Sequence, residues 1–361
     1  MDTFFLIESV VKIFTMIAAV MGLATILTWV ERKQSAVMQD RIGANRADIF
    51  GIRIIGLFQP FADAIKMITK EDYIPPFGNK VLHMIAPAIA YIPVMLLFAV
   101  IPMGPPLEIG GRIVNTQIAN IDIGLLFIFA FGGIAVYGAV IGGWASNNKY
   151  ALIAAIRTSA QMISYEVCLG LSLIGAIMIY GTVDLSQMIA EQSGHWFGWI
   201  PRWGIFIQPL GALLFIPAAI AENKRIPFDL PEAESEIIGY YTEYSGLKGG
   251  LFMMTEFIEM VLISALFSVI FLGGWNVPWL EYNGFNFPWG GTWTLNIWVV
   301  KGMQFGAYFL KVAVLIYFFT LVRWTLPRFR YDQVMRLGWR YLFPLALINL
   351  LITGIAVVLF A

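Results

Sequence analysis

The chain has 361 residues, of which 59% are hydrophobic and 13% are charged, and its 23 basic residues balance 23 acidic ones. This balance gives no basic patch of the kind that nucleic acid binding needs. The single cysteine, Cys168, excludes a disulfide framework or a cysteine-ligated cluster within the chain. With only two distant histidines, His83 and His195, we expect no metal site. Any redox cofactors therefore belong to partner proteins.

Apolar runs of about 20 residues recur along the chain, and a helix of that length crosses a bilayer core of about 30 Å. The mean hydropathy of +0.76 agrees with a membrane protein. Helices satisfy their own backbone hydrogen bonds in lipid, so we predict an all-α polytopic fold in which residues 1–361 form a single membrane domain. About eight transmembrane helices are expected, near 10–30, 81–101, 121–143, 157–180, 202–221, 250–274, 302–322 and 341–360.

The basic residues predict the orientation of these spans. Of the 23 lysines and arginines, 18 fall in the odd-numbered loops and three in the even-numbered loops. Since basic loops stay on the cytoplasmic side, we expect the long loops 31–80 and 222–249 to face the cytoplasm or its equivalent. Both termini then lie on the opposite side.

The first long loop contains a candidate amphipathic helix, "IFGIRIIGLFQPFADAIKMITKED". Its apolar residues recur at helical spacing from Ile54 to Ile68, while polar residues such as Asp63 and Lys66 interrupt them. This pattern predicts a helix at the membrane surface that is broken near Pro60. A helix that merely anchors the loop is the alternative.

Carboxylates inside the predicted spans are costly in lipid and therefore point to function. Glu166 lies nine residues into the fourth span, about 13 Å deep. Glu31 and Glu222 close the first and fifth spans, and Glu256 and Glu259 lie three residues apart in the sixth. All five fall on the predicted cytoplasmic half. Ion pairing is the alternative role, for Glu31 with Arg32 or Lys33 and for Glu166 with Arg157.

The fifth loop adds a dense acidic run, "PFDLPEAESE". Its prolines, Pro227 and Pro231, predict an ordered loop that leads into a short helix, with the acids near the positive helix N-terminus. Clustered carboxylates can exchange protons near neutral pH, so the run and the intramembrane acids predict a one-sided pool of titratable sites. The alternative is that the loop acids are simply solvated. The four acids of the run are Asp229, Glu232, Glu234 and Glu236.

Several segments, in order along nearly the whole chain, resemble one family: the H-type membrane subunit of bacterial respiratory complex I, together with its mitochondrial counterpart. They are "WVERK", "DRIGANR", "QPFADAIKMITKED", "GWASNNKYALIAAIRTSAQMISYEV", "ENKRIPFDLPEAESE", "TEYSG", "FMMTEF" and "LPRFRYDQVMRLGWRYLFPLALINL". The resemblance implies a place at the junction of the redox and membrane arms of a proton-translocating NADH:quinone oxidoreductase. There the subunit forms the quinone passage, and its acidic funnel links quinone reduction to proton translocation.

The resemblance also implies roles for individual residues. The proton-path acids of the family match Glu31, Glu166, Asp229, Glu232, Glu234, Glu236, Glu243 and Glu256. Quinone-binding positions match Arg32, Gln59, Asp63, Phe228 and Arg330. Positions that dock neighbouring subunits match Arg41, Arg46 and Arg328.

For cofactors and partners, the resemblance implies quinone as substrate, no cofactor held by this chain, and iron–sulfur clusters and flavin in partner subunits. Expected partners are the peripheral-arm subunits of the quinone site, neighbouring membrane subunits and lipids. The expected location is the bacterial plasma (inner) membrane, or the mitochondrial inner membrane for an organellar chain, with periplasmic termini in the bacterial case.

Two other functions remain open at this point. One is the homologous membrane anchor of an energy-converting hydrogenase or formate hydrogenlyase complex, and co-purifying partners would discriminate it. The other is a stand-alone proton-coupled transporter, which would also explain intramembrane acids. The sequence shows no internal repeat of the kind that marks many transporters, which counts against this last function.

Overall fold

The structure, a computed structural model, describes residues 3–196, 198–231, 237 and 239–360. Within these residues, seven helical segments are long and apolar enough to cross a membrane, which confirms the all-α polytopic fold class. Six are single helices: α1 (Thr3–Met38), α3 (Lys80–Leu97), α4 (Gly124–Ala145), α5 (Lys149–Tyr180), α9 (Gly246–Phe271) and α10 (Ile297–Thr325). The seventh runs through α11 (Tyr331–Arg336), a π-helical turn (Leu337–Leu342) and α12 (Phe343–Phe360).

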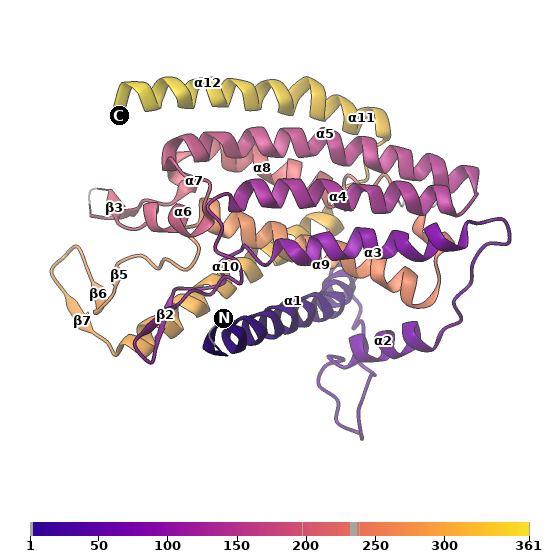
Figure 1. Cartoon of the computed structure of the whole chain (residues 1–361), viewed down its shortest axis with the longest axis horizontal. Coiled ribbons are helices and arrows are strands. Elements are labelled where there is room, and N and C mark those ends of the chain that lie inside the picture. Colours follow the sequence, from indigo (N-terminus) through magenta and orange to yellow (C-terminus); the bar gives the residue numbers. More distant parts are fainter. Residues whose placement is uncertain (1–2, 197, 232–236, 238, 361) are drawn as a thin grey trace.

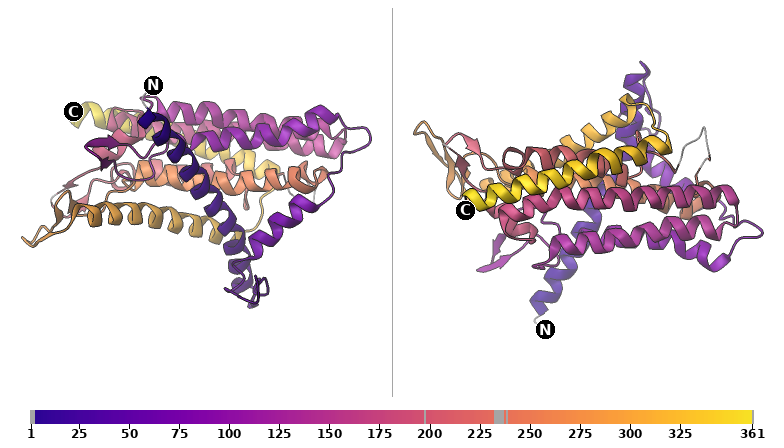
Figure 2. Two further views of the ribbon diagram at one scale, coloured as in Figure 1. Left: turned by 60° about the horizontal axis from the view of Figure 1, so that its bottom comes forward. Right: turned by 90° about the horizontal axis from the view of Figure 1, so that it is seen from above.

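Helices α3, α4 and α5 lie side by side, with α12 packed against the outer face of α5 (Figure 1). Helix α1 crosses this layer obliquely and meets α9 and α10 (Figure 2). Helix α9 lies in the middle, and 89% of its most apolar window is buried, which explains why its sequence is hydrophobic all round. The central core is therefore organised around α9.

The predicted span 202–221 forms two helices, α7 (Gly204–Ile207) and α8 (Pro209–Glu222). The chain bends at Gln208, because Pro209 lacks the amide hydrogen that would continue the hydrogen bonds of α7. With 14 residues, α8 is about 21 Å long, shorter than the bilayer core. It packs mainly against α5.

The amphipathic helix α2 (Gln59–Thr69) begins one residue before Pro60. The prediction of a helix broken near Pro60 is therefore wrong, since Pro60 lies in the first turn, where a missing N–H is not needed. The remaining elements are short. They are α6 (Leu185–Glu191), the 3₁₀ turn Tyr241–Glu243, and the antiparallel pairings of β1 (Leu107–Ile109) with β2 (Arg112–Val114), β3 (His195–Trp196) with β4 (Ile200–Pro201), and β5 (Leu280–Glu281) with β6 (Gly284–Asn286) and β7 (Thr292–Thr294).

The strands gather at the end of the bundle where both termini lie, and α2 lies toward the other end (Figure 1). The two ends of the bundle are therefore built differently. One end carries the short hairpins, and the other carries α2 and the loop before α9.

A latch of backbone and side-chain contacts holds the C-terminal end of α2 against the start of α9. The Ser245 hydroxyl donates to the Glu71 carbonyl (2.6 Å) and accepts from the Tyr73 amide (3.1 Å). The Lys248 ammonium pairs with Asp72 at 2.8 Å. Gly246 has a φ of +60°, and a Cβ added there would lie 3.0 Å from the Lys70 carbonyl oxygen. The latch therefore needs glycine at 246.

We expect Gly246→Ala to loosen this latch, because alanine is strained at positive φ and its methyl group meets the α2 backbone. Hydrogen–deuterium exchange of peptides from residues 66–73 should become faster by severalfold. Gly302→Ala is the matched control, since a Cβ at Gly302 in α10 meets nothing within 4 Å. Equal exchange in wild type and Gly246→Ala would show that the contacts do not hold α2.

Candidate functional site

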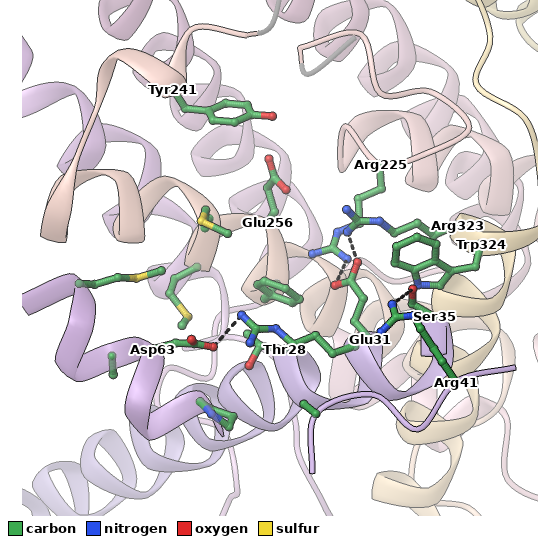
Figure 3. Close-up of a pocket in the computed structure, with 18 residues that line it drawn as sticks. Thr28, Glu31, Ser35, Arg41, Asp63, Arg225, Tyr241, Glu256, Arg323 and Trp324 are labelled. Carbon is green, nitrogen blue, oxygen red and sulfur yellow. Dashed lines mark hydrogen bonds and ion pairs between the residues drawn. The ribbon is translucent and has the colours of Figure 1, made fainter. Parts of the chain in front are cut away.

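A cavity of about 670 Å³ lies among α1, α2, α9 and α10 (Figure 3). Its wall combines charged side chains with methionines and aromatic residues. It is lined by Thr28, Glu31, Arg32, Ser35, Arg41, Ala44, Pro60, Asp63, Ala64, Met67, Arg225, Tyr241, Met253, Met254, Glu256, Phe257, Arg323 and Trp324. The cavity can therefore hold a molecule that is partly polar and partly apolar.

Helix α2 forms one wall of this cavity and shows different residues on its two faces. Asp63 and Met67, one turn apart, line the cavity. Phe61, Ile65 and Ile68 also follow helical spacing, and their side chains are between 57% and 69% exposed. The width of α2 therefore separates the cavity from an apolar face that points outward.

Glu31 is clamped by two arginines that come from distant parts of the chain. Its carboxylate lies 3.1 Å from Nη1 of Arg225 and also pairs with Arg323 (Figure 3). Arg225 stacks over the ring of Phe257 at 4.4 Å. Glu31 is only 7% exposed, so the two guanidiniums offset the cost of burying its charge.

The basic neighbours of Glu31 in sequence make other contacts. The Arg32 guanidinium pairs with Asp63 at 2.7 Å, and the Gln59 carboxamide donates to the same carboxylate at 3.3 Å. Lys33 donates to the side chain of Asn45. The alternative that Glu31 pairs with Arg32 or Lys33 is therefore wrong. Three predicted quinone-binding residues, Arg32, Gln59 and Asp63, do come together.

A second, smaller cavity of about 50 Å³ brings together carboxylates from three helices. Glu166 of α5, Glu222 of α8 and Glu259 of α9 line it. Glu256, which lines the first cavity, is one helical turn from Glu259. A Cβ added to Gly133 of α4 would lie 3.3 Å from Oε1 of Glu166, so this glycine gives the carboxylate room. Helix α9 thus links the two cavities.

A buried lysine and a buried tyrosine flank the acids of α9. The Lys224 ammonium lies 3.3 Å from Oε2 of Glu259. Burial favours the neutral amine, but the charges of Glu259 and other nearby acidic groups outweigh it, so the pKa of Lys224 is raised. Burial also raises the pKa of Tyr240 to about 12. Lys224 therefore remains a cation beside the carboxylates.

The start of the acidic run is buried and tied to neighbouring elements. Asp229 is 3% exposed and pairs with Arg328 at 3.1 Å. The ring of Phe228 packs 5.8 Å from that of Tyr165, and the Phe228 carbonyl accepts a 2.6 Å hydrogen bond from Gln161. The other predicted acids of the run, Glu232, Glu234 and Glu236, and the predicted short helix, lie outside the described residues.

Of the remaining predicted residues, Glu243, Arg46 and Arg330 line neither cavity. Glu243 accepts a 2.6 Å hydrogen bond from Asn148, the N-cap of α5. Arg46 is exposed in the first loop, and Arg330 is exposed and pairs with Asp332. Among the predicted docking residues, Arg41 does line the larger cavity and donates to Ser35 and Gln39. Arg157, the suggested partner of Glu166, lies over the ring of Tyr331.

Sequence reasoning missed three cations at the two cavities. Each of them follows directly after an apolar run or closes one: Lys224 and Arg225 in "AENKR", and Arg323 in "TLVRW". Such positions also suit ordinary interfacial anchors. Only the packing of α1, α8, α9 and α10 shows that these cations meet the acids.

Comparison with known proteins adds to this geometry. A family model described as NADH dehydrogenase matches residues 11–354. The H subunit of NADH-quinone oxidoreductase from Flavobacterium psychrophilum is 45% identical over 100% of both chains. An H subunit of the same enzyme from Cytophaga hutchinsonii is 44% identical over 99% of this chain and 98% of its own length. One from Geobacter metallireducens is 46% identical, with 95% and 94% coverage.

Proposed function

Since the chain belongs to the family of NADH-quinone oxidoreductase H subunits, we propose that it admits quinone from the membrane and links its reduction to proton translocation. The chain is a membrane subunit of this enzyme complex and acts in catalysis only within the assembly. Its relatives thus show which enzyme complex the chain belongs to, and the proposal concerns the role of this subunit in that complex.

The larger cavity, with α2 as one of its walls, supports the proposal that this chain admits quinone. A volume of about 670 Å³ is within the range of small-molecule sites. The polar head of a quinone would face Arg32, Asp63 and Glu256, and the prenyl tail would follow the methionines of α2 and α9. The outward apolar face of α2 would lie in the membrane surface, which gives the tail a continuous apolar route.

The small acidic cavity carries the proposal for proton coupling. Three carboxylates line it, one of which, Glu259, pairs with Lys224, and a proton taken up by one acid changes the field at the others. Glu256 and Glu259 lie on consecutive turns of α9, with a rise of about 4.5 Å between them. We infer a path from Glu31 and Glu256 at the quinone cavity to Glu259, Glu222 and Glu166.

The acidic run and Glu243 also belong to the proposed path. Asp229 pairs with Arg328, and the ring of the preceding residue, Phe228, packs against that of Phe329, in the segment that leads into α11. Quinone reduction consumes two protons, and unit charges 4 Å apart interact by about 4 kcal/mol at an effective dielectric constant of 20. Such a change is large relative to the net worth of a hydrogen bond, about 1 kcal/mol. The run is therefore suited to respond to quinone chemistry.

The wider assembly follows from the same proposal. Flavin and iron–sulfur clusters would belong to partner subunits, with the peripheral arm docked near Arg41 and Arg46 of the first loop. Arg328 already pairs with Asp229, so a docking role for Arg328 would compete with this ion pair. We place the chain in the bacterial plasma (inner) membrane with periplasmic termini, or in the mitochondrial inner membrane for an organellar chain.

We expect Ala64→Trp to raise the apparent KM for quinone about tenfold or more, because the indole fills space next to Met67 inside the cavity. Ala62→Trp is the matched control, since Ala62 is exposed and does not line the cavity. Electron transfer from NADH to an artificial acceptor in the peripheral arm should stay unchanged in both variants. If Ala64→Trp and Ala62→Trp have the same quinone KM, the cavity is not the route.

We expect Glu166→Gln to leave the complex assembled while lowering quinone-linked turnover and proton translocation together, each by about 100-fold, as for loss of a proton-transfer group. Glu281→Gln in β5 is the control, because this carboxylate is exposed and outside both cavities. Proton pumping is measured in vesicles by a pH-sensitive dye, with NADH as the donor. Wild-type pumping in Glu166→Gln would remove this residue from the path.

A further inference from the structure

A second large cavity, of about 470 Å³, lies at the start of α10. Hairpin β1–β2, the turn between β5 and β6, and the first turns of α10 form its walls. Lys301 in this cavity and Arg323 in the quinone cavity belong to the same helix, 22 residues or about 33 Å apart. The two cavities therefore lie at opposite surfaces of the membrane.

Lys301 and Glu108, which carry opposite charges, line this cavity at different depths relative to the membrane. Lys301 is one turn inside the membrane-spanning helix α10, whereas Glu108 belongs to strand β1 outside the spans. The two groups interact electrostatically. In the part of the chain that the structure describes, no direct ion pair joins them, so a polar group can lie between them.

The other walls have the chemistry of a membrane interface. Trp298 and Tyr282 are 61% and 60% exposed, and aromatic residues with a polar atom are enriched at the level of lipid headgroups. Leu107, Ile113 and Ile297 supply apolar surface beside them. The positive N-terminal end of α10 adds to the field of Lys301 and favours a phosphate.

We propose that this cavity binds the headgroup of a phospholipid with a primary ammonium, of the phosphatidylethanolamine class. In such a lipid the phosphate lies closer to the hydrocarbon than the ammonium does. Lys301, the deeper group, then binds the phosphate, and Glu108 accepts hydrogen bonds from the ammonium. A trimethylammonium headgroup has no N–H to donate, so choline lipids bind less well.

The complete complex, reconstituted in vesicles, tests this site with photoreactive analogues of phosphatidylethanolamine and phosphatidylcholine. In wild type, the ethanolamine analogue should label peptides 106–113 and 297–301 more than the choline analogue does. Lys301→Met should lower this labelling about tenfold, which corresponds to about 1.4 kcal/mol. Glu108→Leu, which leaves no side-chain acceptor, should instead remove the preference for ethanolamine over choline. Both effects are independent of quinone chemistry.

Exposed residues on the same side of the membrane provide matched controls. Glu191→Gln and Arg202→Gln remove one charge each outside the cavity and should leave labelling unchanged. NADH oxidation with an artificial acceptor checks that each complex is assembled. Equal labelling by both analogues in wild type, or full labelling of Lys301→Met, would overturn the proposal. The proposal would also be overturned if neither peptide were labelled and a neighbouring subunit were found cross-linked to Lys301. The cavity would then belong to an interface with a protein partner.

Discussion

A charge buried in an apolar helical bundle is stable only with an opposite charge beside it, and this constraint organises the half of the bundle near α2. Glu31 lies seven residues before the end of α1 and is held by Arg225 after α8 and by Arg323 near the end of α10. Removing one partner from such a group typically costs several kcal/mol. The clamp therefore ties α1 to the segment after α8 and to the last turn of α10. The larger cavity lies beside this clamp and is closed on one side by α2.

Helix α9 is a core helix that also carries two acids, and hydroxyls along it are satisfied within the helix at Thr255 and Ser264. Toward its far end, Ser264 donates to the Met260 carbonyl at 2.8 Å, so the hydroxyl needs no partner from another helix. Its two acids, Glu256 and Glu259, lie in the first half and face different cavities. A rigid, buried helix therefore carries the proposed link between quinone and proton chemistry.

The fold was largely predictable from apolar length and the distribution of charge, because the bilayer thickness leaves little choice of element. The exceptions are local. Pro209 divides the predicted fifth span, and Pro60 starts α2 where a break was expected. The site was only partly predictable. Helical spacing placed Asp63 and the acids of α9 correctly on their helices, but the partners of a buried charge come from other helices.

The pairing of Glu31 shows why the sequence alone could not supply the site. Its neighbours Arg32 and Lys33 looked like natural partners, yet a helix points adjacent side chains in different directions. Arg32 therefore reaches Asp63 of α2, and Glu31 meets cations far away in the sequence. Long-range packing of this kind leaves no periodic signal in one sequence.

The uneven distribution of charge across the bundle also bears on why this chain needs partners. The acids that line the larger cavity and the small acidic cavity range from Glu31, seven residues before the end of α1, to Glu166 near the middle of α5. Toward the other end, Lys311 donates to the carbonyls of Leu272, Gly274 and Asn276, which occupies all three of its N–H groups. A lysine bound in this way stabilises the end of α9 and is poorly placed to pass protons on. The proposed proton path and this lysine therefore lie toward opposite ends of the bundle, in a chain that acts only as a subunit of a larger enzyme.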